Sequence, residues 1–286
     1  PFLSPEQIDQ FHRDGFLVLP GYFSAETVSK LRSEIASVIT TMDPQDYPIF
    51  TTNEQDRQVS ADYFLTSGDK IVPFLEEKAA KLPDGAAVPF HLRINKIGHA
   101  LHDLNPVFHE VSYDPKVGRI CRDLGSVKPM AVQSMYIFKQ PNIGGEVGMH
   151  QDGSFLYTVP QTCVGFWWAL DDCTTTNGCL YALPGSHKEG VRRQFRRRAD
   201  VEAGTEFVPA EADSWDRTGE VSLECPAGTL VLIHHSVVHY SAANTSPHPR
   251  HAYSIHTVDS REGVVYPPEN WLQRCDGSPF NCVPYQ

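Results

Sequence analysis

The first forty residues carry hydrophobic positions with the spacing of α-helices. Ser-Pro-Glu at positions 4–6 is typical of a helix start, and Gly15 predicts the end of that helix. Residues 16–20 favour a short strand, and a second helix is predicted from Ser24, where apolar residues recur every three or four positions. Two further helical segments are predicted at 106–111 and 116–124.

After Gly125 the pattern changes to short apolar runs separated by Gly, Pro and Asn, which is typical of β-strands and turns. The predicted strands are 130–139, 154–158, 163–170, 179–183, 229–233 and 252–258. The chain is therefore predicted to be mainly β, with a β-sandwich or jelly-roll core. We expect one domain over residues 1–286, with mainly helical cover in 1–125 that includes a polar loop at 43–58, a β-core in 126–260, and a C-terminal tail in 261–286.

Composition narrows the class of partner. With 286 residues, of which 41% are hydrophobic and 21% charged, the chain can bury a substantial core, and its apolar runs are too short to cross a bilayer. Its formal net charge of −11 argues against a nucleic-acid partner and favours a small molecule. Seven cysteines without a C-x-x-C pair indicate reduced thiols and a cytoplasmic location, unless a targeting segment upstream of Pro1 has been removed.

Three His-x-Asp/Glu tripeptides, at 12–14, 150–152 and 187–189, are candidate metal-binding pairs. Side chains two positions apart share a face on a strand but not on a helix. The first tripeptide lies in a predicted helix and the third follows a Pro-Gly-Ser turn. Only His150 and Asp152, which a Gly-rich loop delivers to a predicted strand, combine the required ligand types with a workable geometry.

Two imidazoles and one carboxylate on one face of an iron ion leave open positions, which is the arrangement of non-haem iron(II) oxygenases. The third ligand must then come from a later strand. His234, His235 and His239 all follow the apolar run 230–233, and spacing alone does not choose among them.

Several ordered motifs resemble the phytanoyl-CoA dioxygenase family, and especially its short phytanoyl-CoA dioxygenase domain-containing members. The similarity covers nearly the whole chain, and several motifs in order are more specific than one tripeptide. The segments that carry it are 14–18, 95–102, 144–146, 150–152, 177–180, 184–187, 230–234, 239–241 and 250–253.

This resemblance implies a double-stranded β-helix core and an iron(II) site formed by His150, Asp152 and His239. The family places its distal ligand before a Ser two residues on and an Arg eleven residues on, which in this chain are Ser241 and Arg250. An Arg also offers a bidentate fork to a carboxylate. The resemblance further implies that 2-oxoglutarate and O2 are co-substrates, and that the 2-oxoglutarate pocket is lined by Lys96, Met135 and Trp167.

The expected reaction is hydroxylation of a small organic substrate with release of succinate and CO2. Departures from the family pattern lie near the iron and are predicted to affect substrate choice, at Met149, Gly153, Tyr181 and His235. A cationic run at 192–198 is either a solvated loop or a clamp for a carboxylate or phosphate on the substrate. Its candidate substrate-binding residues are Arg192, Arg196, Arg197 and Arg198.

Other functions share parts of this pattern. The same iron chemistry could desaturate a small carboxylate metabolite or close a ring in natural-product biosynthesis. A zinc hydrolase could use two His and one carboxylate, but it would leave Ser241 and Arg250 without a co-substrate to hold. A jelly roll that binds without turnover is the third alternative. The sequence does not identify the substrate or the oligomeric state.

Overall fold

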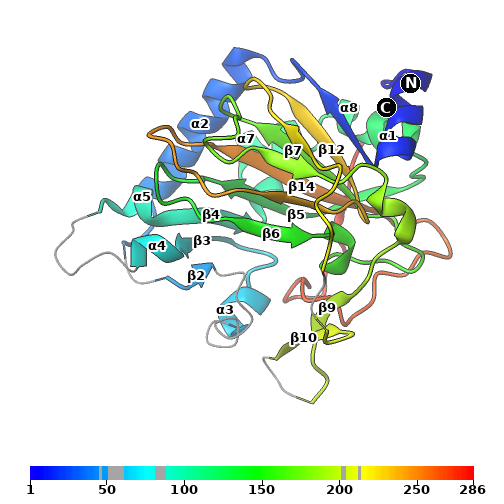
Figure 1. Ribbon diagram of the computed structural model, residues 1–286. Helices are drawn as coiled ribbons and strands as arrows, with labels where there is room; N and C mark the ends of the chain where they lie inside the picture. The colour runs from blue at the N-terminus through cyan, green and yellow to red at the C-terminus, as the bar shows by residue number, and fades with distance from the viewer. Residues whose placement is uncertain (45–46, 51–60, 81–87, 201–203, 212–213) are drawn as a thin grey trace.

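The computed structural model describes residues 1–44, 47–50, 61–80, 88–200, 204–211 and 214–286. Two mostly antiparallel sheets pack face to face (Figure 1). The large sheet contains, in spatial order, β1 (Phe16–Leu19), β12 (Leu230–His234), β7 (Val164–Ala169), β14 (Ala252–Asp259), β5 (Pro129–Ile137), β4 (Ile94–His99), β3 (Ile71–Glu76) and β2 (Ile49–Phe50), with β15 (Asn281–Cys282) paired to β5. The small sheet contains β11 (Val221–Leu223), β8 (Leu180–Ala182), β13 (His239–Ser241) and β6 (Val147–His150), and β9 (Gln194–Arg197) pairs with β10 (Thr205–Val208).

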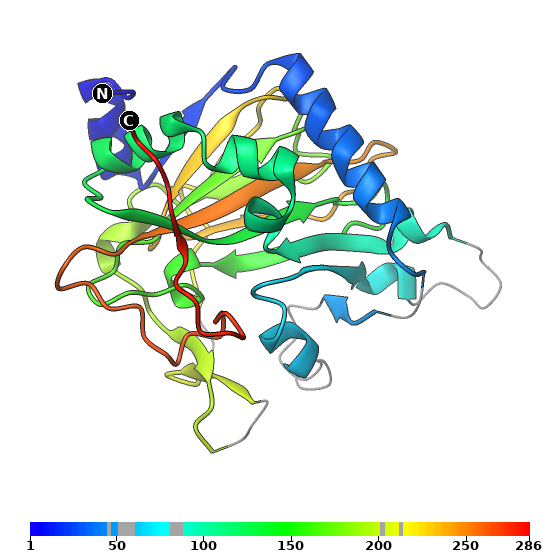
Figure 2. The same cartoon turned by 180° about the vertical axis from the view of Figure 1, so that it is seen from behind.

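Helices cover the outer face of the large sheet, as Figure 2 shows from behind. The described helices are α1 (Pro5–Asp14), α2 (Ala25–Thr40), α3 (Ala61–Leu65), α4 (Glu77–Ala80), α5 (Phe90–Arg93), α6 (Leu101–Leu104), α7 (Pro106–Ser112) and α8 (Pro115–Asp123). Helix α3 lies outside this layer and packs in a separate cluster with Trp271. Apolar residues of α2, α7 and α8 join buried residues of β7, β12 and β14 in one core cluster. The helical layer therefore buries one face of the sheet and leaves the other face to the small sheet.

Local sequence signals account for the predicted helices. Ser4 and Gln7 form a capping box at the start of α1, and Gly15 ends the helix in the left-handed conformation with φ +86°. The side chain of Ser24 accepts a hydrogen bond from the backbone of Thr27 at the start of α2. The predicted helices at 106–111 and 116–124 correspond to α7 and α8.

Strand alternation separates the two faces of the large sheet. On β7, Trp168 faces the helical layer, where it stacks on Phe23 at 5.2 Å between ring centroids. Its neighbour Trp167 belongs to the cluster between the two sheets. On β14, Tyr253 packs toward the helices in the same way, while Ser254 faces the space between the sheets. Neighbouring residues on these strands therefore point to opposite faces of the sheet, one into the helix-covered core and the next into the space between the two sheets.

The mainly β prediction and the jelly-roll core are confirmed, but the predicted strand at 154–158 is wrong. Residues Asp152–Ser154 form a 3-10 turn, and the backbone N–H of Gly153 donates to the carbonyl of His235 at 2.7 Å. The N–H groups of Phe155 and Leu156 return to the carbonyl of Asp152. These bonds turn the chain away from the extended path that its apolar residues favour.

Strands also lie where mainly helix or tail was expected. β3 and β4 extend the large sheet from within the first 125 residues, and β15 with buried Trp271 anchors the C-terminal segment. In the expected loop at 43–58, residues Ile49–Phe50 form β2, and 45–46 and 51–58 lie outside the described residues. All seven cysteines are free thiols. Within the described ranges, no helix is long and apolar enough to cross a membrane.

Candidate active site

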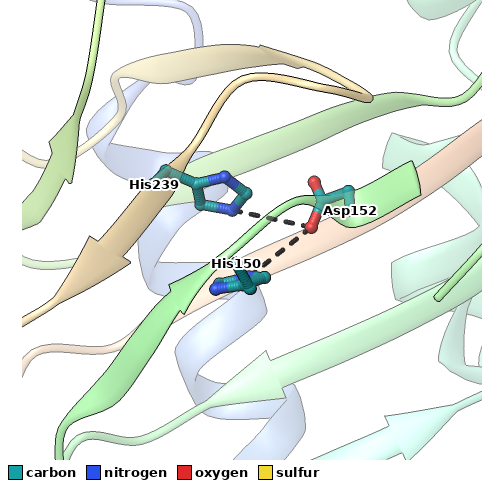
Figure 3. A group of neighbouring side chains, drawn as sticks. All are labelled: His150, Asp152 and His239. Atoms are coloured by element: carbon teal, nitrogen blue, oxygen red, sulfur yellow. Dashed lines mark ion pairs between the residues drawn. The ribbon is translucent and has the colours of Figure 1, made fainter. Parts of the chain in front are cut away.

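The predicted metal dyad lies at one wall of a cavity of about 400 Å³ between the two sheets. His150 is the last residue of β6, and Asp152 lies on the turn that follows it. His239 opens the neighbouring strand β13, where it is directly paired with His150. Figure 3 shows the two imidazoles pointing from these strands toward the carboxylate. The structure therefore brings His239 beside a His-Asp dyad that is distant from it in sequence.

The three side chains have the geometry of a facial metal site. The Nε2 atoms of His150 and His239 lie 3.7 and 3.5 Å from Oδ1 of Asp152. One ligand atom from each residue lies within 4.8 Å of the others. Two imidazoles and one carboxylate suit iron(II) and leave further coordination positions open. The donor set thus fits the metal that the sequence predicts.

Backbone carbonyls orient both imidazoles. Nδ1 of His150 lies 2.8 Å from the carbonyl oxygen of Gly148, and Nδ1 of His239 lies 3.1 Å from that of Val237. An N–H at Nδ1 leaves the lone pair of Nε2 directed at the metal position. Burial lowers the pKa of His150 to about 4, so this imidazole is neutral at physiological pH, as a ligand must be.

A third histidine, His256 on β14, holds the other oxygen of Asp152, with its Nε2 3.2 Å from Oδ2. Burial alone would raise the pKa of Asp152, but the imidazoles around it, with His239 first, hold that pKa below its ordinary value. Gly165 on β7 lies opposite His256, and a Cβ atom there would meet Oδ2 at 2.9 Å. His256 and Gly165 therefore shape the seat of the carboxylate, and neither was predicted.

Arg250, which precedes β14, lies at another part of the same cavity and is 1% exposed. Its Nε donates to the carbonyl of Gly178 at 3.0 Å, and its guanidinium lies 5.3 Å from the centre of the Trp167 ring. Its Nη1 has no hydrogen-bond partner among the residues that the structure describes. A buried guanidinium with an unused donor fits a carboxylate ligand such as that of 2-oxoglutarate.

The other residues predicted for the co-substrate also line this cavity. Lys96 on β4 is 6% exposed, and its Nζ lies 4.0 Å from the sulfur of Met135 on β5. Ser241 ends β13, on the opposite sheet, and accepts a hydrogen bond at Oγ from the ammonium of Lys139. Two sheets thus supply the predicted 2-oxoglutarate site.

The residues predicted to affect substrate choice divide into two groups. Met149 lines the cavity, beside the iron ligands. Gly153 packs against the backbone of His235, whose Nδ1 pairs with the hydroxyl of Ser236, and neither Gly153 nor His235 lines the cavity. Tyr181 stacks on Tyr240 at 4.8 Å between centroids, and of these two it is Tyr240 that lines the cavity.

The four arginines predicted to bind the substrate are directed elsewhere. Ion pairs join Arg192 to Glu189 at 2.8 Å, Arg196 to Glu206 at 3.4 Å, and Arg198 to Asp200 at 2.6 Å. The guanidinium of Arg197 donates to backbone carbonyls of Leu65 and Trp271. None of these four lines the cavity; on β9, Arg196 alternates with Phe195, whose ring lines the cavity, and therefore faces away from it.

Arg193 is the member of the cationic run that reaches the cavity, where its guanidinium lies 3.8 Å from the centre of the Phe207 ring. The surrounding wall is aromatic and comes from remote segments, namely Phe64, Phe74, Phe155, Phe195, Phe207 and Trp271. Sequence reasoning missed this wall. Ser254 and His256 share the strand parity of Arg250, so alternation along the chain could have predicted that they line the cavity. The aromatic residues come from separate segments, and no pattern within one segment predicts that they meet.

Comparisons with known proteins agree with this geometry. Residues 11–252 match the family model of phytanoyl-CoA dioxygenase (PhyH). A phytanoyl-CoA dioxygenase domain-containing protein 1 homolog from Dictyostelium discoideum is 45% identical over 284 residues, which cover 98% of this chain and 99% of that protein. A phytanoyl-CoA dioxygenase from Arabidopsis thaliana is 43% identical over 272 residues, which cover 95% and 94% of the two chains.

Two solved structures share the fold. EctD from S. alaskensis, in a structure with 2-oxoglutarate and 5-hydroxyectoine, has a TM-score of 0.65 at 20% identity, covering 100% of this chain and 88% of its own. The non-heme alpha ketoglutarate dependent carbocyclase SnoK from nogalamycin biosynthesis has a TM-score of 0.64 at 19% identity, covering 93% and 87%.

The fold and the site together define a 2-oxoglutarate-dependent non-haem iron dioxygenase, with Fe(II) as metal and 2-oxoglutarate and O2 as co-substrates. The chain belongs to the phytanoyl-CoA dioxygenase family, as its family match and its curated relatives show. The predicted family, enzyme class and cofactors are confirmed. A zinc hydrolase and a jelly roll without turnover are not supported.

Proposed function

We propose that this dioxygenase hydroxylates a small organic substrate that has an apolar body and one carboxylate or phosphate group. The observation that carries the proposal is the position of Arg193, which brings a guanidinium into an otherwise aromatic part of the cavity. The ring of Phe207 beneath it packs on Phe155, which in turn lies 6.2 Å from the imidazole of His150. A substrate held there would place its apolar body beside the metal.

The roles of the side chains follow from their positions. His150, Asp152 and His239 would hold iron(II), and Arg250 would anchor the distal carboxylate of 2-oxoglutarate. When bound, iron and 2-oxoglutarate would supply the oxidising power, with succinate and CO2 as the co-products of 2-oxoglutarate. The chain itself orients both substrates and keeps water out, for which a cavity of about 400 Å³ between two buried sheets is suited. The aromatic wall supplies hydrophobic contact for the body of the substrate.

Charge supports an anionic substrate. The chain has a formal net charge of −11, so a cation at the cavity gives an approaching anion a local attraction that the rest of the surface opposes. Two relatives bear the name phytanoyl-CoA dioxygenase, so an acyl-CoA thioester belongs among the candidate substrates. Apolar carboxylic acids of a size compatible with the cavity are the others.

The test is a screen of apolar carboxylates, phosphates and acyl-CoA thioesters for substrate-dependent succinate formation. For a hit, Arg193→Gln should raise the KM at least tenfold, because a hydrogen bond to a charged group contributes about 1.5–3 kcal/mol. Arg196→Gln is the matched control, since Arg196 pairs with Glu206 and does not line the cavity. Equal KM values in the two variants would contradict the proposal.

Mass spectrometry of the product tests the reaction type. Hydroxylation adds one oxygen atom, whereas desaturation or ring closure removes two hydrogens, so the two outcomes differ for any substrate. For neutral analogues of the hit, in which an amide replaces the carboxylate, the native enzyme and Arg193→Gln should have similar KM values. If the native enzyme turns over the neutral analogue with the same kcat and KM as the anionic hit, the substrate does not need an anionic group and the proposal is wrong.

A further inference from the structure

Lys139, two residues after β5, is a buried ammonium outside the cavity that contacts the predicted co-substrate site. It is 2% exposed. Its Nζ donates to Oγ of Ser241 at 2.8 Å, to the carbonyl of Gly145 at 2.8 Å and to the carbonyl of Ala242 at 2.7 Å. An ammonium has three N–H donors and no acceptor, so these three oxygens match a charged Lys139.

The contact decides what the hydroxyl of Ser241 can do. A hydroxyl has one O–H donor, and an oxygen that already accepts from an ammonium keeps that donor for another partner. Ser241 and Arg250 both line the cavity, where Arg250 Nη1 is a second unused donor. The two groups can therefore present N–H and O–H donors to one carboxylate.

A buried carboxylate completes the arrangement. Glu76, at the end of β3, is 2% exposed and accepts from the backbone N–H of Gly145 at 3.1 Å and from the amide of Asn95 at 2.7 Å. Asn95 also lines the cavity. Burial and the nearby charge of Arg250 lower the pKa of Lys139, the negative charge of Glu76 opposes that effect, and the three acceptor oxygens around Nζ favour the ammonium form. Gly145 thus contacts both buried side chains, through its carbonyl to Lys139 and through its N–H to Glu76.

This arrangement also explains the Gly-Gly pair that the sequence motif contains. A Cβ atom at Gly145 would lie 2.9 Å from Oε1 of Glu76, and one at Gly144 would lie 2.8 Å from the backbone carbon of Lys139. Real Cβ atoms do not approach so closely, so larger residues would push the loop off both charges. The glycines permit the close approach of the loop to Lys139 and Glu76.

We infer that Lys139 is a positioning residue for 2-oxoglutarate, which acts by fixing the hydroxyl of Ser241 as a donor to the distal carboxylate beside Arg250. This inference rests on the assignment of Arg250 and Ser241 to the co-substrate. Lys139 does not touch the cavity itself. Its effect is therefore expected on 2-oxoglutarate affinity and not on iron affinity.

The test uses the iron-loaded enzyme under anaerobic conditions, with 2-oxoglutarate binding measured by calorimetric titration. Lys139→Met and Ser241→Ala should each raise the Kd for 2-oxoglutarate about tenfold, the effect of one hydrogen bond to a charged group. Because Lys139 acts through Ser241, the double variant should resemble the weaker-binding single variant. Native affinity in Lys139→Met, or a roughly hundredfold loss in the double variant, would overturn the inference.

A kinetic readout separates positioning from general damage. In uncoupled 2-oxoglutarate turnover, Lys139→Met should raise the KM for 2-oxoglutarate and keep kcat within about twofold, whereas a distorted iron site would lower kcat. If Lys139→Met does not fold, Lys139→Gln replaces it, since its uncharged amide has only two N–H donors for the three oxygens around Nζ and a side chain one atom shorter. The same rise in KM is expected, and an unchanged KM counts against the inference.

Two controls separate this inference from the assignment on which it rests. Lys30→Met removes an exposed lysine that pairs with Glu110, and it should leave 2-oxoglutarate binding unchanged. Arg250→Lys should weaken binding by at least tenfold, because a point charge cannot replace the guanidinium fork. If Arg250→Lys binds normally, the assignment fails. If only Lys139→Met binds normally, the assignment stands and the inference about Lys139 is wrong.

Discussion

His256 offers a direct test of how the metal site is built. Its Nε2 lies 3.2 Å from Oδ2 of Asp152, and the two side chains are 6% and 8% exposed. A buried polar contact to a carboxylate contributes at most about 1.5–3 kcal/mol, which corresponds to roughly 10- to 150-fold in affinity. His256→Leu should therefore weaken iron(II) binding by about 10- to 100-fold, the range expected for loss of a partner that orients a ligand.

The assay is competition between the protein and a chromophoric chelator for iron(II), under anaerobic conditions. His256→Gln is the informative second variant, because its amide N–H can reach the position of Nε2 and should restore much of the affinity. His99→Gln is the control, since His99 lines the same cavity but its Nδ1 pairs with the hydroxyl of Ser67. Equal iron affinity in His256→Leu and His99→Gln would refute the role of His256 at Asp152.

Three further predictions concern the ligands and the stability of the fold. Asp152→Ala should abolish iron binding and 2-oxoglutarate decarboxylation, whereas Asp14→Ala on α1 should leave both intact, and the chelator assay distinguishes them. His239→Ala should lose iron, whereas His235→Ala should retain it. Loss of iron from His235→Ala would show that the assignment of His239 as the distal ligand is wrong. Burial lowers the pKa of His102 to about 4. Between about pH 6.5 and 4 this histidine is therefore protonated in the unfolded chain but not in the folded one, so the free energy of unfolding falls as the pH is lowered. Denaturant unfolding of His102→Phe should accordingly show a fall in stability that is shallower by about 1.4 kcal/mol per pH unit, and an unchanged slope would contradict this assignment.

Local physics explains why much of this architecture was predictable from the sequence. The capping residues Ser4 and Ser24 act on backbone groups three positions away, so their effect can be predicted from adjacent residues. Strand periodicity likewise predicts β5, β7, β12 and β14 within one or two residues. The dyad of His150 and Asp152 was predictable because two residues on one short segment nearly suffice for a chelate.

Tertiary structure overrides local preference elsewhere. Residues 154–158 have the composition of a strand, yet the bond from Gly153 N–H to the carbonyl of His235 makes the chain turn. The strand β4 is stabilised by pairing with β5, and β3 by pairing with β4, so their own sequences carry a weaker signal than those of the central strands. Such elements depend on partners that lie far away along the chain.

The binding site shows the same division. Sequence alone determined which residue types could hold iron and a carboxylate, because ligand chemistry belongs to the side chains themselves. Only the packing of two sheets decided that His256 supports Asp152, that Lys139 reaches Ser241, and that Arg193 is the arginine that faces the cavity. Each of these contacts joins segments that are unrelated in sequence, and their distances are set by strand pairing and sheet packing, which no local pattern encodes.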